Sequence, residues 1–348
     1  MNNDEDEDEF ASSHEWIQDT RLAIIDLLLE SPEVDVNAQD NFGISPFHTA
    51  AQKEYLFECV AEKLINKGAK ISFCTKKNKT PLHFAVASGN GGFVSKLLEL
   101  GADPAERDID GLNALHYAAK ERHLLIFGEI LNHIPISLSQ TVLESKDNSG
   151  QNLLHHLLNH GFVDVAFVRY LLENVSGIND LDQAGMNPMA VFLSAFALCE
   201  HRSDPEILDF LSENGADPSF TTAGGLNLGH LVAGSHRVSK RVLRTLMKRG
   251  VSLTSSDEQG RTVLHHASIK GSLTEEVLRF LYEEVGLPLD ICDKHGKTAL
   301  DYAIEKGKED HGPDLFKPDR WKKTERLLRG MEKEVLLRGQ TIRHTYHC

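Results

Sequence analysis

Histidine is the residue type that most strongly suggests chemistry in this chain, which holds 18 of them among 348 residues. An imidazole serves as a general base or as a zinc ligand. Two adjacent pairs occur, His155-His156 and His265-His266, and the C-terminus reads His344-Thr-Tyr-His347-Cys348. Adjacent residues point to different sides of a helix, so neither pair is suited to share one metal ion. The terminal triplet has ligand types at a chelating distance but no fourth ligand nearby, and we expect no metal site.

Other catalytic patterns are weak. No serine stands in a GxSxG nucleophile elbow. The run Gly89-Asn90-Gly91-Gly92 has no strand before it and no Lys-Ser or Lys-Thr after it, unlike a loop that cradles phosphate. A chain with 52 Asp and Glu residues holds many acidic pairs by composition alone, so these pairs do not identify an acid–base site. The sequence therefore predicts no catalytic residue and no cofactor, and we expect the chain not to be an enzyme.

Six of the histidines share one position in a repeated phrase. The phrase begins with Gly and continues with a small polar residue, often Pro, then an apolar residue and His, as in Gly43-Ile-Ser45-Pro46-Phe47-His48. The other histidines at this position are His83, His116, His155, His230 and His265. Copies start at Gly43, Asn78, Gly111, Gly150, Gly185, Gly225, Gly260 and Gly296, at spacings of 35, 33, 39, 35, 40, 35 and 36 residues. Such self-similarity is typical of a repeat protein.

A second phrase follows many of these copies. It is an amphipathic segment that ends in a turn, as in Leu97-Leu98-Glu-Leu-Gly101-Ala102-Asp103-Pro104. Joined to Thr80-Pro81-Leu82-His83 at this period, it resembles the ankyrin repeat over residues 20 to 330. The resemblance implies an all-α solenoid of stacked helix–turn–helix units with hairpin loops. It also implies that the repeated His is structural, bonding the backbone between neighbouring repeats.

Each residue type in the two phrases has a physical reason. The first Gly permits positive φ at the hairpin, and Asn78 is a residue that tolerates it. Ser45, Thr80 and Thr298 can cap the first helix, with Pro at its first position in two copies. Gly68, Gly101, Gly215 and Gly250 are expected to end the second helix in the left-handed region. One helix pair cannot bury its own apolar face, so neighbouring repeats must stack.

The repeats give a domain plan. We expect an acidic, disordered tail over residues 1–15, a capping repeat over 16–39 and an array reaching residue 330, followed by a basic helix or tail over 331–348. Repeats start near residues 40, 75, 108, 147, 182, 222, 257 and 293. The amphipathic segment from Trp321 to Leu328 is a plausible C-terminal cap. Extra residues near 132–141 and 195–204 predict loops, which either contact a partner or reflect neutral drift in length.

Departures from the pattern concentrate in three repeats. The fifth repeat reads Asn187-Pro188-Met189-Ala190 without the His, the sixth reads Asn227-Leu228-Gly229-His230, and the last has Asp301 in the His position. These changes put local geometry in doubt rather than the fold.

The composition limits the classes of partner and the cellular compartments that we expect for this chain. The net charge of −15 repels phosphate backbones, so we expect no nucleic acid as a partner. Five scattered cysteines without a framework spacing favour a reducing compartment. The acidic start is unlike a signal peptide, and no run of 18 apolar residues occurs, so we expect a cytoplasmic protein that does not insert into a membrane, without excluding the nucleus.

The function expected from the resemblance is protein binding as an adaptor, scaffold or inhibitor. In this family the hairpin tips and the outward positions of the first helices line a concave surface. Mapped onto this chain, the expected contact residues are Phe42, Lys76, Lys77, Ile109, Asp110 and Asn148 at the tips, and Gln52, Lys53, Lys120, Glu121, Asn159 and His160 on the first helices. Phe42 and Ile109 are either hot spots for a partner or pack against a neighbouring hairpin. The alternatives are a regulatory subunit or enzyme with a site at the irregular fifth and sixth repeats, and a subunit that self-associates.

Overall fold

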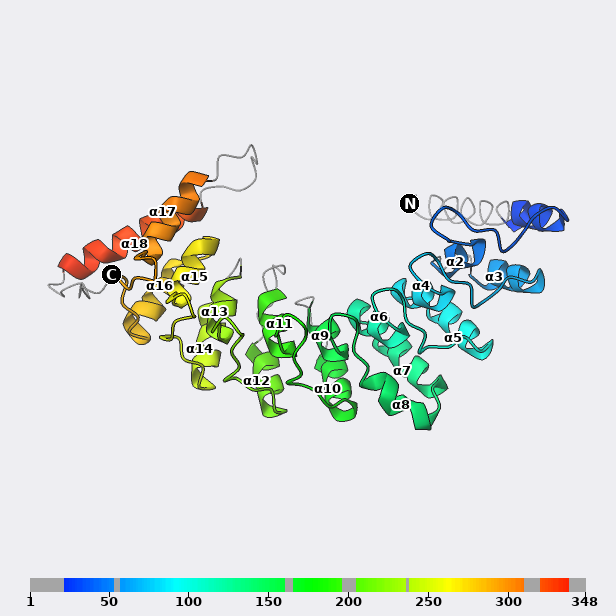
Figure 1. Ribbon diagram of the computed structural model, residues 1–348, viewed down its shortest axis with the longest axis horizontal. Coiled ribbons are helices and arrows are strands. Elements are labelled where there is room, and N and C mark those ends of the chain that lie inside the picture. The colour runs from blue at the N-terminus through cyan, green and yellow to red at the C-terminus, as the bar shows by residue number, and fades with distance from the viewer. Residues whose placement is uncertain are drawn as a thin grey trace, which may run out of the picture. The chain divides into compact units, whose positions relative to one another are not determined.

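The structure is a computed structural model that describes residues 22–52, 57–159, 165–195, 205–235, 238–309 and 320–337. The chain divides into two compact units, residues 1–148 and 149–348. Both units are built from helices (Figure 1). The only β structure in the described ranges consists of two isolated bridges, Thr221–Asn227 and Ser256–Thr262. The fold class is therefore the all-α solenoid that the repeats predict.

The first unit begins with a helix over residues 22–30 and continues with helix pairs. The pairs are α2 (Pro46–Ala51) with α3 (Phe57–Asn66), α4 (Pro81–Ala87) with α5 (Gly91–Glu99), and α6 (Ala114–Glu121) with α7 (Leu124–His133), which α8 (Ile136–Leu143) follows. The first helices of neighbouring pairs contact one another, and so do the second helices, which is the stacking expected of repeats.

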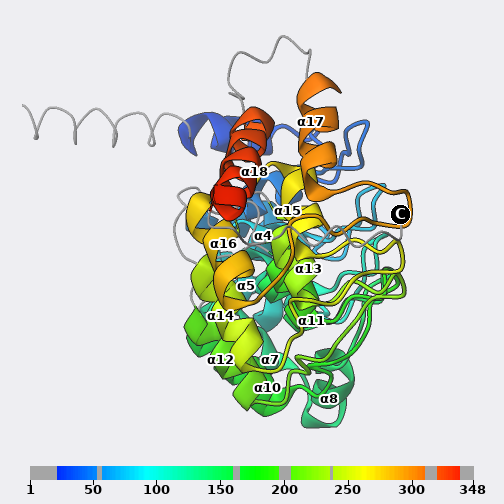
Figure 2. The ribbon, with the colours of Figure 1, turned by 90° about the vertical axis from the view of Figure 1, so that its left-hand side faces the viewer.

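The described residues of the second unit form five more pairs. They are α9 (Leu153–Leu158) with α10 (Val165–Asn174), α11 (Pro188–Ala195) with α12 (Pro205–Glu213), α13 (Leu228–Ala233) with α14 (Lys240–Lys248), α15 (Val263–Lys270) with α16 (Glu275–Arg279), and α17 (Ala299–Glu309) with α18 (Arg320–Leu337). A π-helical turn over Phe280–Glu284 prolongs α16. In Figure 2 the hairpins of this unit lie on one side of its first helices, and α12, α14 and α16 lie on the other.

The core of each unit consists of small residues on the first helices and large ones from both helices. Ala85 and Ala118 are fully buried, which lets α4 and α6 approach closely. Phenylalanines fill the remaining space, and the rings of Phe47 and Phe93 lie 5.3 Å apart at a tilt of 56°. Burial of this apolar surface between repeats, rather than within one pair, stabilises the stack.

Backbone geometry at the repeat boundaries agrees with the glycine pattern. The eight residues that begin the first phrase all have positive φ, including Asn78 at 56°. The four glycines expected to end second helices, such as Gly101 at 85°, also have positive φ. Ser45 and Thr80 precede α2 and α4 with extended φ and ψ, and a proline follows each of them. These local predictions are confirmed.

One expectation for an irregular segment is wrong. The extra residues of the third repeat do not form a loop, because Ile136–Leu143 is the helix α8. The segment from Trp321 is part of the helix α18, which packs against α15, α16 and α17, as the expected C-terminal cap would.

The ends of the domain plan fall partly outside the described residues. Helix α18 passes residue 330 and continues to Leu337, with Met331 and Val335 buried. Residues 1–15, the fifth-repeat insertion over 196–204 and residues 338–348 lie outside the described ranges.

Candidate functional site

Five of the repeated histidines each cap their own helix and bond the backbone of the next repeat. In the second repeat, the Thr80 backbone N–H donates to Nδ1 of His83, with N and Nδ1 3.0 Å apart. This leaves Nε2 of His83 to donate to the Leu112 carbonyl oxygen of the third repeat at 3.2 Å. His48, His155, His230 and His265 make the same cross-repeat bond at 3.0–3.2 Å, to the carbonyls of Lys79, Met186, Ser255 and Lys297. These histidines therefore have the structural role that the resemblance implies.

Burial keeps these rings neutral. Desolvation lowers the pKa of His83 below its ordinary value of 6.5, although the carboxylate of Asp108 and a backbone bond oppose the shift. The pKa values of His48, His155, His230 and His265 are lowered for the same first reason. A neutral ring is the form that accepts at Nδ1 and donates at Nε2.

His266 shows how an adjacent histidine is used. Its Nε2 lies 3.0 Å from Oδ2 of Asp257, while His265 bonds Lys297 of the following repeat. The two rings thus serve different partners, as their adjacency on a helix predicts. Desolvation lowers the pKa of His266 to about 4. Burial alone would raise the pKa of Asp257, but hydrogen bonds from Arg261 and His266 lower it to about 2.

No group of three or more His, Cys, Asp or Glu side chains that could hold a metal ion occurs in the part of the chain that the structure describes. The terminal residues His344, His347 and Cys348 lie outside that part.

The hairpin tips form rows joined by backbone hydrogen bonds. In the first unit, the Lys76 N–H donates to the Phe42 carbonyl at 2.9 Å and the Ile109 N–H to the Lys77 carbonyl at 3.0 Å. The Asn148 N–H extends the row by donating to the Asp110 carbonyl at 2.9 Å. Each tip is thus held by its neighbour, and the side chains at the tips project from a fixed backbone.

The structure brings four of the predicted contact residues together on adjacent hairpins. We call Phe42, Lys76, Lys77 and Ile109 the hairpin-tip patch. Phe42 is 70% exposed and Ile109 is 55% exposed, so neither is buried against a neighbouring hairpin. Both lysines are also exposed.

The remaining predicted contact residues are not part of the hairpin-tip patch. Asp110 is exposed beside Ile109, Asn148 is exposed at the next tip, and Gln52 and Glu121 are exposed near the ends of α2 and α6. Lys120 is half-buried. Asn159 is exposed in the second unit, and Lys53 and His160 lie outside the described residues.

One feature of the second unit was not predicted from the sequence. The hairpin rows continue from Ser149 to Gln183 and from Gly224 to Glu258, but no backbone bond joins Ala184 to Ala223 in these described hairpins. A Cβ added to Gly225 would lie 3.0 Å from the Glu258 nitrogen, whereas one added to Gly185 would meet nothing within 4 Å. The 40-residue spacing and the missing His at Ala190 were the available signals.

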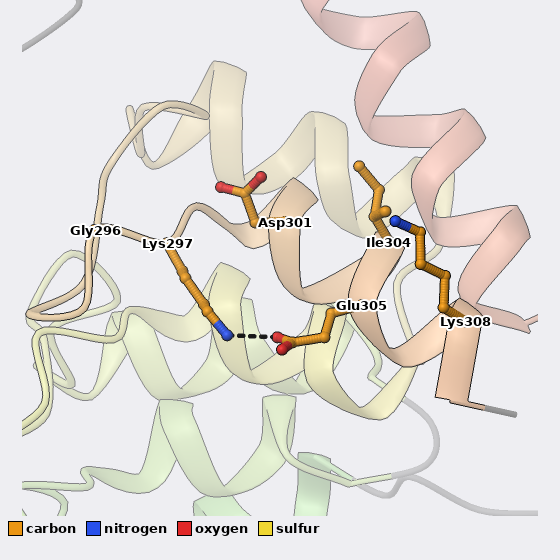
Figure 3. Close-up of a pocket in the computed structure, with 6 residues that line it drawn as sticks. All are labelled: Gly296, Lys297, Asp301, Ile304, Glu305 and Lys308. Carbon is orange, nitrogen blue, oxygen red and sulfur yellow. Dashed lines mark hydrogen bonds and ion pairs between the residues drawn. The ribbon is translucent and has the colours of Figure 1, made fainter.

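A shallow pocket of about 580 Å³ lies on the last repeat (Figure 3). It is lined by Gly296, Lys297, Asp301, Ile304, Glu305 and Lys308. Its polar groups are engaged, because Lys297 pairs with Glu305 at 2.6 Å and Asp301 accepts from the Thr298 hydroxyl at 2.7 Å. In earlier repeats the residue at the position of Asp301 is a His that bonds a following hairpin.

Comparison with known proteins agrees with this geometry. The family model for ankyrin repeats matches residues 14–108, 63–140 and 230–317, which together exceed half of the chain. The chain belongs to the ankyrin repeat family.

Several curated proteins are similar over part of their length. A palmitoyltransferase of Lachancea kluyveri is 27% identical over 62% of this chain and 28% of its own. The human transient receptor potential cation channel subfamily A member 1 is 26% identical over 68% of this chain and 20% of its own. Mouse NF-kappa-B inhibitor alpha is 29% identical over 32% of this chain and 35% of its own. The matches thus span about a third or less of these relatives.

A solved structure supports the fold alone. The ankyrin repeat domain of human ASB11 aligns with a TM-score of 0.53 at 20% identity, covering 64% of this chain and 92% of that one. Among the described residues, no helix has both the length and the apolar content to cross a bilayer.

Proposed function

We propose that this chain is a non-catalytic protein-binding module, an adaptor, scaffold or inhibitor, that holds its partner on the hairpin and first-helix surface of the first unit. The observation that carries the proposal is the hairpin-tip patch. Two large apolar side chains stand 70% and 55% exposed on a hydrogen-bonded row of hairpins. Exposed apolar anchors on a rigid backbone are suited to a binding surface, because little conformational freedom is lost when a partner covers them.

Membership of the ankyrin repeat family supports the proposal. The name of the mouse relative describes an inhibitor of another protein. The match to the palmitoyltransferase covers 28% of that enzyme, and catalytic activity is a property of that protein.

The compartment is part of the same proposal. We place the protein in the cytoplasm, where thiols stay reduced, and we allow the nucleus. Cys74 and Cys292 are free thiols, and Cys74 is exposed, which suits a reducing environment.

Affinity capture tests the proposed function. We would compare the full chain with a variant that carries Phe42→Ala, Lys76→Glu, Lys77→Glu and Ile109→Ala. A matched control carries Arg241→Glu and Lys248→Glu on α14, since both side chains are exposed and their replacement changes the charge equally. We expect at least one protein to be captured by the wild type and the control but lost from the patch variant. Identical capture by all three would contradict the proposed surface.

A regulatory or catalytic role at the fifth and sixth repeats is the second candidate. The open hairpin row between Ala184 and Ala223 is the observation in its favour, because unpaired backbone groups are available to a ligand there. A screen for turnover or for small-molecule stabilisation of the full chain tests it, and no response across the screen would remove it.

A further inference from the structure

Lysines are concentrated in the segment that forms the second hairpin. Residues 63–79 contain six lysines and no Asp or Glu, in a chain whose net charge is −15. Lys63 pairs with Asp26 at 2.5 Å. Lys76 and Lys77 are exposed at the tip, and neither forms an ion pair within the described ranges. The hairpin-tip patch is thus a basic site on an acidic protein.

Nearby carboxylates are already used by the hairpins. Oδ1 of Asp40 accepts from the backbone N–H groups of Phe42 and Ile44, both at 2.8 Å. Oδ2 of Asp108 accepts from the hydroxyl of Tyr117 at 2.7 Å, and Asp108 is buried. These carboxylates stabilise the turns and are not directed at the two tip lysines.

The apolar anchors flank the lysines. Phe42 is bonded through its carbonyl to Lys76, and Ile109 through its N–H to Lys77. The order along the row is therefore apolar, basic, basic, apolar. Asp110, exposed beside Ile109, ends the basic stretch on one side.

We infer that the partner presents an extended acidic segment carrying a bulky apolar side chain to the hairpin-tip patch. The inference rests on the proposed function, since it names the class of protein segment that this surface holds. Carboxylates of the partner pair with Lys76 and Lys77, whose charges have no ion-pair partner among the residues that the structure describes. The apolar side chain packs on Phe42 or Ile109 and contributes the larger share of the affinity.

The test uses a defined probe, a fluorescein-labelled synthetic peptide in which Asp and Glu surround one Phe. Binding to the full chain is measured by fluorescence anisotropy at about 50 mM and about 200 mM NaCl, because screening separates the charge contribution. Two companion peptides replace the acids by Asn and Gln, or the Phe by Ala. A variant lacking residues 1–9 is measured beside the full chain, since Asp4–Glu9 and Phe10 have the same chemistry as the probe.

We expect Lys76→Glu with Lys77→Glu to weaken binding of the acidic probe at least about tenfold, and the α14 control pair by less than about twofold. Phe42→Ala with Ile109→Ala is expected to weaken the Phe-containing probe but not its Ala companion. The charge-reversed variant could misfold, so we would also measure Lys76→Gln with Lys77→Gln, which removes the two charges without reversing them. Circular dichroism checks that both variants keep their helix content.

Four results would overturn the inference. They are no binding at about 50 mM NaCl, equal losses in the patch and control variants, equal patch-dependent binding of single-stranded poly-dT, and binding that appears only after residues 1–9 are removed. The third result would indicate a general polyanion site, and the fourth would make the chain's own acidic head the occupant. If the acidic probe fails while patch-dependent capture persists, the partner class is wrong and the proposed function stands.

Discussion

At the scale of single residues, the same imidazole that invites a catalytic interpretation is used as a structural connector. His83 links the cap of its own helix to the backbone of the next repeat. Asp301, which replaces the His in the eighth repeat, keeps only part of this role. Asp301 accepts from the Thr298 N–H and hydroxyl, so it keeps the capping half of the role.

We predict that His83→Ala destabilises the first unit by about 1–3 kcal/mol, because it leaves the buried Thr80 N–H without its partner and removes one of the two hydrogen bonds to the Leu112 carbonyl, which still accepts from the Asp108 N–H. Urea denaturation measures the free energy of unfolding. His133→Ala, at an exposed position in the same unit, is the control and should change it by less than about 0.5 kcal/mol. Equal effects of the two variants would show that the cross-repeat bond is unimportant.

Stability should also depend on pH in a defined direction. The folded-state pKa of each buried connector lies below its ordinary value of 6.5, so the unfolded chain takes up protons first. The stabilisation is complete above about pH 6.5 and is lost as the pH falls toward the folded value, about 4 for His266. Asp257, with a pKa of about 2, loses its contribution only at lower pH.

We therefore expect the urea midpoint to fall between about pH 7 and about pH 5, and His266→Gln to reduce this slope. A midpoint that is constant or rises over this interval would contradict the assignment of neutral rings.

At the scale of the elements, the junction between the fifth and sixth repeats is bonded less than the others. Ala190 replaces the connecting His, and the tips at Ala184 and Ala223 share no backbone bond. Asn179 still donates to the Gly215 carbonyl at 2.7 Å, and α11 still packs on α13. The junction is therefore held at its base and open at its hairpins.

Hydrogen exchange can detect this opening directly. The amides of Ala223, Glu258 and Lys294 occupy equivalent exposed positions, but only the last two donate to the preceding hairpin. We predict that Ala223 is protected at least about tenfold less than the other two. Equal protection would mean that the hairpin row is continuous in solution.

A pair of glycine variants gives an independent test. Gly185 and Gly225 both have positive φ, so alanine costs roughly 1–2 kcal/mol of backbone strain at either site. At Gly225 the new methyl group also meets the Glu258 nitrogen at 3.0 Å, while at Gly185 it meets open space. Chemical denaturation should show Gly225→Ala to be at least about 1 kcal/mol more destabilising. The opposite order would contradict the open junction.

At the scale of the whole molecule, the repeated phrase contains enough information for the fold. Gly43 and Asn78 predicted turns that the structure contains, and Ser45 and Thr80 predicted where helices begin. The periodic phrases carry these signals because each repeat has the same local task. The segments outside the repeated phrases were harder to assign. The helix α8 and the role of α18 depend on which neighbouring helices are present to pack against.

The binding surface was predictable only in part, for a related physical reason. Family position placed Phe42 and Ile109 at the tips, but only coordinates show that both remain exposed beside two lysines. The basic character of the patch is hidden by the net charge of −15, because net charge describes the chain and not one hairpin.

Hydrogen–deuterium exchange of the full chain, with and without a captured partner, tests the central claim most directly. We predict new protection of the hairpins at residues 40–43, 75–78 and 108–111, with no change at the matched hairpins 257–260 and 293–296. Protection confined to the second unit, or no protection of the Lys76 hairpin at saturating partner, would contradict the assignment of this surface.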